Sequence, residues 1–215
     1  MSNFIKRILT SLPLIILIYV ALLNKIYLAI ILIFISYFIL SEIYNILKKI
    51  YLDKKKFFFS YIISTLYIIF FSVLIFIYLF PDDQQNELKI FYILLICIST
   101  DVGGYVFGKT FKGKKLTKIS PNKTFSGMYG SFLLPLTIFA VFYNFSILNI
   151  EYLYLSIFIS FISQIGDLFI SSLKRKARLK DTGNLLPGHG GILDRIDGII
   201  FAVPFSILLI IYFNI

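Results

Sequence analysis

The run IISTLYIIFFSVLIFIYLF, residues 62–80, indicates the class of fold. It carries no charged side chain, and about 18 or more apolar residues suffice to cross roughly 30 Å of hydrocarbon. A helix of a soluble bundle would show a polar face at a period of 3.6 residues, and this run shows none. The whole chain of 215 residues is 59% hydrophobic, with a mean hydropathy of +0.89. The sequence therefore predicts an all-α polytopic membrane protein.

Charges and prolines divide the rest of the chain into further apolar segments. The first resembles a signal peptide but lacks a small-residue cleavage site, so we expect an uncleaved first span. The chain has one cysteine, Cys97, so an intramolecular disulfide is excluded. Cys97 lies in an apolar run. Seven spans are expected, at about residues 8–23, 26–47, 57–80, 90–107, 128–143, 152–173 and 192–213.

The basic residues test this count of spans. With the N-terminus inside, 19 of the 21 lysines and arginines fall on the inner side, and only Lys25 and Lys89 fall outside. Such a bias in the loops orients spans, so we expect the N-terminus in the cytoplasm and the C-terminus outside. The net charge of +10 then reflects topology rather than nucleic-acid binding. Anionic lipid head groups account for the basic loop at 48–56.

Several carboxylates stand where lipid-facing residues are expected. Glu42, Asp101 and Asp167 lie within or beside apolar segments, where an acid is costly and by default indicates function. For Glu42 we favour an ion pair with a loop lysine. Helical spacing places Asp101 with Tyr105 and Gly108 on one face, and Asp167 with Ser171 and Lys174 on another.

The stretch SSLKRKARLKDTGNLLPGHGGILDRIDG, residues 171–198, holds six cations, three carboxylates and the only histidine. Asp194 and Asp197, at i and i+3, can converge on one cation, and with Asp167 they supply the hard oxygens that suit Mg²⁺ and phosphate. Basic side chains can bind phosphate oxygens, and glycines around His189 let backbone N–H groups approach an anion. These phosphate-binding candidates are Lys174, Arg175, Lys180 and Arg195, with Gly188, Gly190 and Gly191 in the turn.

One motif match is rejected. Residues 103–110, GGYVFGKT, fit the P-loop pattern GxxxxGK[ST]. A P-loop follows a buried strand and opens a soluble helix. Here the bulky Tyr105, Val106 and Phe107 lie at the end of a membrane span, so we expect no P-loop.

These residues carry a family resemblance. The pattern formed by Ser171-x-Leu173-Lys174-Arg175, Lys180-Asp181-x-Gly183 and residues 186–197 resembles the signature of phosphatidate cytidylyltransferases, also called CDP-diacylglycerol synthases. A second block, from Asp101 through Lys123-Thr124 to Gly127, resembles the nucleotide-side loop of that family. The resemblance covers about residues 95–200. Ser126 stands where the family usually has Glu, and the chain is shorter than many members.

The resemblance implies a nucleotidyltransferase that converts CTP and phosphatidate to CDP-diacylglycerol and pyrophosphate with Mg²⁺. It implies catalytic roles for Lys174, Arg175, Lys180, His189 and Arg195, and metal binding by Asp167, Asp194 and Asp197. The substrate-binding residues would be Asp101, Tyr105, Lys109, Ser120, Lys123, Thr124, Ser171, Gly190 and Gly191. His189 either donates to phosphate, which we favour, or orders the glycine turn. A second metal ion and a homodimer stay open.

We therefore expect residues 1–89 to form structural helices and residues 90–215 to form the catalytic region, with the active site facing the cytoplasm of a bacterial inner membrane. Two alternatives remain. The first is a related CTP-dependent enzyme that acts on a polyprenol or another lipid phosphate. The second is a lipid or ion transporter, which predicts acids and bases in both halves of the chain, whereas they crowd the C-terminal half.

Overall fold

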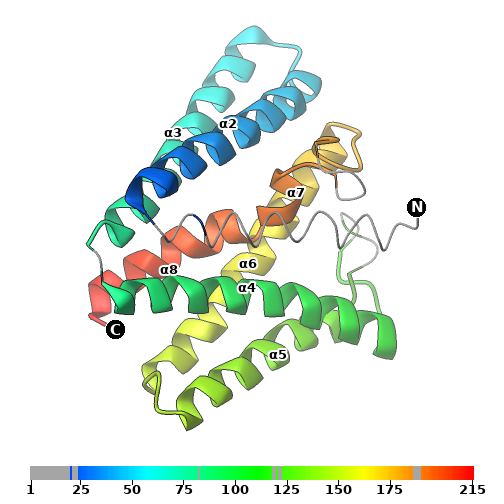
Figure 1. Ribbon diagram of the computed structural model, residues 1–215. Helices are drawn as coiled ribbons and strands as arrows, with labels where there is room; N and C mark the ends of the chain where they lie inside the picture. The colour runs from blue at the N-terminus through cyan, green and yellow to red at the C-terminus, as the bar shows by residue number, and fades with distance from the viewer. Residues whose placement is uncertain (1–19, 21–23, 82, 118–119, 121–122, 186–189) are drawn as a thin grey trace, which may run out of the picture. The chain divides into compact units, whose positions relative to one another are not determined.

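The computed structural model describes residues 20, 24–81, 83–117, 120, 123–185 and 190–215 (Figure 1). The regular secondary structure of this part of the chain is helical, and Lys115 and Thr124 form an isolated β-bridge. Its helices are α2 (Lys25–Ile50), α3 (Lys54–Leu79), α4 (Gln84–Phe111), α5 (Phe125–Asn144), α6 (Glu151–Lys176), α7 (Leu193–Ile196) and α8 (Ile199–Phe213).

Five of these helices, α2 to α6, are long and apolar enough to cross a membrane. They confirm the spans expected at 26–47, 57–80, 90–107, 128–143 and 152–173, and the chain is an integral membrane protein. The first expected span, at 8–23, lies outside the described residues. The chain divides into two compact units, Met1–Glu87 with Leu173–Ile196, and Leu88–Ser172 with Asp197–Ile215.

The seventh expected span, at 192–213, is wrong as a single helix. The chain forms the short α7, leaves the helix at Asp197 and Gly198, and continues as α8, which has only 15 residues. The Oδ1 atom of Asp197 accepts a hydrogen bond from the Gly198 N–H at 2.9 Å. Such a local side-chain bond competes with the helical ladder, and hydropathy alone does not detect this break.

In the first unit, α2 and α3 form an antiparallel pair (Figure 1). Both helices start at a side-chain cap, since Asn24 accepts from the Ile26 N–H and Asp53 accepts from the Lys55 N–H, each at 2.9 Å. The hydroxyls of Ser36 and Ser72 lie 2.7 Å apart and join the two helices through a hydrogen bond. The short connection at 51–53 makes the two helices neighbours.

In the second unit, hydroxyl groups connect α4 to α6. The Tyr92 hydroxyl lies 2.5 Å from the Ser156 hydroxyl, and Thr100 donates to Ser160 at 3.1 Å. All four residues are buried. Interhelical hydrogen bonds of this kind stabilise helix pairs in a membrane, where burial of apolar surface provides little force.

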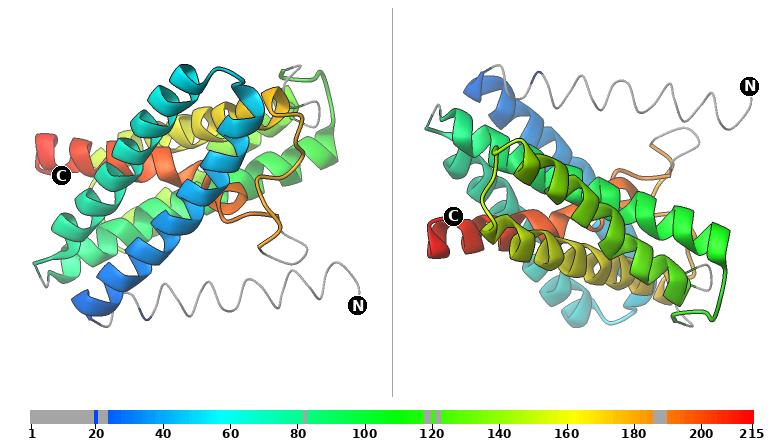
Figure 2. Two further views of the ribbon diagram at one scale, coloured as in Figure 1. Left: turned by 90° about the horizontal axis from the view of Figure 1, so that it is seen from above. Right: turned by 90° about the horizontal axis from the view of Figure 1, so that it is seen from below.

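Helices α4 and α5 pack closely through glycines, and they lie side by side in the views of Figures 1 and 2. A Cβ atom on Gly130 of α5 would lie 2.6 Å from the carbonyl oxygen of Gly103 of α4 and 2.5 Å from the Phe107 ring. Small residues of this kind let two helix backbones approach each other in a membrane.

Gly130→Ala is therefore expected to destabilise the protein by about 1–3 kcal/mol, because the added methyl group overpacks the α4–α5 contact. Thermal unfolding of the purified protein in detergent measures this effect. Ala140→Ser adds one atom to an exposed position of the same helix and is the matched control. Equal unfolding temperatures for Gly130→Ala and the unsubstituted protein would contradict the proposed close contact.

Candidate active site

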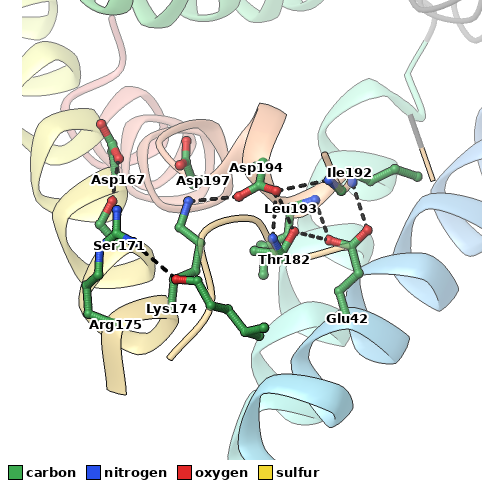
Figure 3. A network of polar contacts seen from close by, with 12 residues as sticks. Glu42, Asp167, Ser171, Lys174, Arg175, Thr182, Ile192, Leu193, Asp194 and Asp197 are labelled. Carbon is green, nitrogen blue, oxygen red and sulfur yellow. Dashed lines mark hydrogen bonds and ion pairs between the residues drawn. The ribbon is translucent and has the colours of Figure 1, made fainter. Parts of the chain in front are cut away.

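Asp194 is the centre of a polar cluster in the first unit (Figure 3). Its Oδ1 atom accepts a hydrogen bond from Lys174 Nζ at 2.8 Å. Its Oδ2 atom accepts from the backbone N–H groups of Thr182, at 2.7 Å, and Gly191, at 2.9 Å. The side chains of Lys174 and Asp194 are 11% and 5% exposed, so this is a buried ion pair. A buried carboxylate needs such partners to remain charged.

Burial raises the pKa of Asp194, but its partners outweigh this effect. The hydrogen bonds from Lys174, Gly191 and Thr182, together with the Lys174 charge, leave the pKa below its ordinary value. Asp194 is therefore a carboxylate at neutral pH. It can accept hydrogen bonds or contact a cation, and it has no proton to donate.

The glycine turn before α7 is shaped by this carboxylate. Gly190 has a φ angle of +83°, a backbone conformation that side chains disfavour. A Cβ atom on Gly190 would lie 2.6 Å from Asp194 Oδ2. His189, for which we expect contact with a phosphate, lies outside the described residues. Gly190 thus permits the turn that brings the Gly191 N–H to Asp194.

The other expected catalytic cations of this unit are more accessible. Arg175 is exposed and donates to the carbonyl of Leu179 at 3.2 Å. Lys180 and Arg195 are also exposed. Exposed basic side chains of this kind can reach a phosphate in water without a large desolvation cost. Their catalytic roles stay predictions.

Glu42 corrects an expectation from the sequence. We expected an ion pair with a loop lysine, but its carboxylate accepts hydrogen bonds from backbone and hydroxyl donors of the first unit. The Ile192 N–H donates at 2.8 Å and the Leu193 N–H at 3.0 Å, and the Thr182 hydroxyl lies at 2.5 Å. Hydropathy identified Glu42 as unusual, but its partners are about 140 residues away in sequence and only the fold reveals them.

The second unit contains a pocket of about 270 Å³ that gathers several of the expected substrate-binding residues. Lys123 and Asp167 form an ion pair at its wall, and Ser171 donates to Asp167 Oδ1 at 3.2 Å. The lining residues are Asp101, Gly104, Tyr105, Leu116, Lys123, Thr124, Gly127, Met128, Ser131, Gln164 and Asp167. Sequence reasoning missed Gln164 and Ser131, since neither stands in a recognisable motif.

The basic loop after α4 is held by local hydrogen bonds. Thr124 caps α5 by accepting from the Gly127 N–H at 3.1 Å. Ser126, at the position where the resembling family usually has Glu, donates to the carbonyl of Lys112. The Ser120 N–H donates to the Thr117 hydroxyl at 3.2 Å. These bonds fix the chain on both sides of Lys123.

The end of α4 supports the rejection of a P-loop. Helix α4 continues to Phe111, so residues 103–110 are helical and form no loop around a phosphate. Lys109 and Tyr105 lie one turn apart and are exposed, with Lys109 Nζ 3.4 Å from the Tyr105 hydroxyl. Their substrate-binding roles stay predictions.

The chemistry of the aspartates fits a magnesium ion, although the described residues contain no group of three or more His, Cys, Asp or Glu side chains that could hold a metal. Within the described residues, Asp194 Oδ1 accepts one hydrogen bond, from Lys174, and so retains a lone pair. Its Oδ2 atom accepts hydrogen bonds from the N–H groups of Thr182 and Gly191. Carboxylate oxygens are the ligands that Mg²⁺ prefers. The convergence of Asp167, Asp194 and Asp197 on one cation stays a prediction.

The fold and the site define a helical membrane protein with basic side chains beside buried carboxylates. The chain belongs to the cytidylyltransferase family, whose pattern matches residues 3–213. It is 36% identical over 222 residues to a phosphatidate cytidylyltransferase of Rickettsia conorii, an alignment that covers 98% of this chain and 93% of that protein.

Two further relatives align with only part of this chain. A phosphatidate cytidylyltransferase of Bacillus subtilis is 43% identical over 136 residues, which cover 61% of this chain and 51% of that protein. One of Staphylococcus saprophyticus is 39% identical over 141 residues, which cover 63% of this chain and 54% of that protein. The matched region thus spans about half the length of these two relatives.

Proposed function

We propose that this chain is a CTP:phosphatidate cytidylyltransferase, which forms CDP-diacylglycerol and pyrophosphate for phospholipid synthesis. The observation that carries the proposal is the alignment with the Rickettsia conorii enzyme, which covers 98% of this chain. The polar clusters around Asp194 and around the Lys123–Asp167 pair support it with groups suited to phosphate chemistry.

In the proposed reaction, an oxygen of the phosphatidate phosphomonoester attacks the α-phosphorus of CTP. A new P–O bond forms, and the bond from the α-phosphorus to the bridging oxygen breaks. Pyrophosphate leaves with the bonding electrons. The attacking oxygen is already anionic, so no strong general base is needed. The barrier is charge repulsion and alignment, which positioning and cationic groups lower.

The basic residues of the chain supply this positioning. Lys174, Arg175, Lys180 and Arg195 would bind phosphate oxygens, the arginines through two parallel N–H groups. Lys123, Thr124 and the pocket beside Asp167 would hold the nucleotide. Lys174 now faces Asp194 and would turn toward a phosphate when substrates bind. Ser171, Tyr105, Lys109, Ser120, Gly190, Gly191 and His189 remain proposed contacts.

Asp167, Asp194 and Asp197 would hold Mg²⁺. The bound metal would neutralise negative charge on the triphosphate and on the departing pyrophosphate. This assignment is supported by the lone pair that Asp194 Oδ1 retains beside Lys174. A second ion and a homodimer remain open proposals.

We further propose that the N-terminus is cytoplasmic, the C-terminus is outside and the site faces the cytoplasm, because the basic loops would then gather on one side. Such a site serves one substrate from the membrane and one from water. A bacterial inner membrane fits the bacterial relatives. Residues 90–215 would supply the catalytic groups and residues 1–89 the supporting helices.

Incubation of the purified protein with phosphatidate and CTP labelled at the α-phosphate tests the proposal. We expect label in a CDP-lipid product when Mg²⁺ is present, and loss of that product when a chelator removes the metal. Excess Mg²⁺ should restore the product. Parallel incubations with prenyl alcohols and CTP labelled at the γ-phosphate separate this reaction from a CTP-dependent lipid kinase, because a kinase transfers that phosphate to the lipid. Label in a prenyl phosphate but not in a phosphatidate product would overturn the proposed substrate.

A further inference from the structure

Glu42 is an acid of the long apolar helix α2 that the proposed reaction does not use. It is only 4% exposed, in a helix of 26 residues whose other buried members are hydrophobic. A carboxylate at such a place is costly unless polar donors surround it. Its surroundings in the first unit therefore indicate what it does.

The carboxylate of Glu42 collects donors from the chain around α7 (Figure 3). The N–H groups of Ile192 and Leu193, at 2.8 and 3.0 Å, would otherwise lack helical acceptors at the start of this short helix. The Thr182 hydroxyl lies 2.5 Å from Glu42 Oε2. Glu42 thus fixes two segments at once, the turn containing Thr182 and the start of α7.

Two glycines leave room for this carboxylate. A Cβ atom on Gly191 would lie 2.5 Å from Glu42 Cδ, a distance that real Cβ atoms do not show, and one on Gly183 would lie 3.1 Å from Glu42 Oε1. Gly191 was expected to approach a substrate anion. Its close neighbours in the structure are the Thr182 hydroxyl and the Glu42 carboxylate.

Thr182 connects Glu42 to Asp194. Its hydroxyl lies between the two carboxylates, 2.5 Å from Glu42 and 3.0 Å from Asp194 Oδ2, while its N–H donates to the same Oδ2 at 2.7 Å. The single hydroxyl proton serves one carboxylate at a time, so the N–H maintains the bond to Asp194. These contacts hold Oδ2 and direct Oδ1 toward Lys174.

We propose that Glu42 is a positioning residue for Asp194, which acts through Thr182 and the start of α7 to present Oδ1 of Asp194 to the proposed metal and phosphates. This inference rests on the proposed function. Packing alone does not require a carboxylate here, because an apolar side chain of similar size would fill the space without a desolvation cost. The three converging donors require one.

The test combines variants at both ends of the connection. Glu42→Gln keeps the shape but presents an amide NH₂ to groups that are themselves donors. Thr182→Val removes the hydroxyl, and Thr182→Ser keeps it. Binding of Mn²⁺ to the purified protein, followed by electron paramagnetic resonance of the free ion, requires no substrate. Loss of an outer partner typically weakens metal affinity about 10- to 100-fold, which we expect for Glu42→Gln and Thr182→Val.

Thr182→Ser should bind Mn²⁺ as the unsubstituted protein does. Glu151→Gln makes the same chemical change as Glu42→Gln at an exposed position in α6 and is the matched control. Thermal unfolding ensures that binding is measured on folded protein. In transfer assays, the two weakened variants should require correspondingly more Mg²⁺ for half-maximal activity.

Unchanged Mn²⁺ affinity in folded Glu42→Gln and Thr182→Val would overturn the inference. Absence of Mn²⁺ binding by the unsubstituted protein would overturn it too, whether or not that protein transfers CMP. Failure of the proposed function has a different signature, since no CDP-lipid would form while the Mn²⁺ comparison among variants could still follow the expected order and support the role of Glu42.

Discussion

Asp194→Asn is expected to lower the rate of CMP transfer by about 10²–10³-fold, the loss typical for removal of one preorganised electrostatic group. The substitution keeps the shape of the side chain and its contacts with Thr182 and Gly191, but it removes the charge that faces Lys174 and the proposed metal. Initial rates with radiolabelled CTP and phosphatidate at saturating Mg²⁺ measure the effect.

The same substitution leaves Lys174 buried without its counter-charge, which costs about 3–5 kcal/mol of stability in comparable buried pairs. The double variant Asp194→Asn with Lys174→Met removes both charges, so it should recover stability without recovering activity. Asp83→Asn is the matched control, because Asp83 is exposed and accepts from the Gln85 N–H, a role that Asn fills equally well. Activity near normal in folded Asp194→Asn would refute the site assignment.

Lys123→Met is expected to lower kcat/KM for CTP about 10- to 100-fold. A charge-assisted hydrogen bond contributes about 1.5–3 kcal/mol, and each 1.4 kcal/mol corresponds to a factor of ten. Lys123 lies at the wall of the pocket in the second unit and pairs with Asp167, so the substitution also leaves that carboxylate without its cation. Steady-state rates at varied CTP measure the loss, and the KM for phosphatidate should change little.

Lys123→Arg keeps the positive charge and should retain much of the activity. Lys56→Met makes the same change as Lys123→Met at an exposed position near the start of α3 and should behave as the unsubstituted protein. A larger effect of Lys123→Met on phosphatidate than on CTP would assign the pocket to the lipid instead of the nucleotide.

Hydropathy predicted the long helices well because the membrane imposes a single requirement. Each span must satisfy its own backbone hydrogen bonds and present apolar side chains to lipid, so length and composition suffice to locate α2 to α6. The same reasoning failed at residues 192–213. The bond from the Gly198 N–H to Asp197 interrupts the helix there, and hydropathy does not register one local bond.

The sequence predicted which types of residue form the candidate site, but it predicted their arrangement only in part. The cluster of cations and carboxylates in residues 171–198 indicated Lys174 and Asp194, which the fold joins in a buried pair. The fold also places Asp101, Lys123 and Asp167 around one pocket. No spacing rule indicated Thr182, because its importance lies in a backbone N–H and in a hydroxyl placed between two carboxylates.

Side-chain polarity and local spacing were enough to predict that the chain crosses a membrane and that its cations and carboxylates suit phosphate chemistry. Tertiary structure alone decided which donors surround each carboxylate. Glu42 accepts hydrogen bonds from the backbone N–H groups of Ile192 and Leu193 and not from a lysine. Asp194 Oδ2 accepts from the backbone N–H groups of Thr182 and Gly191. Contacts between residues far apart in sequence depend on how the helices pack, and no local pattern encodes them.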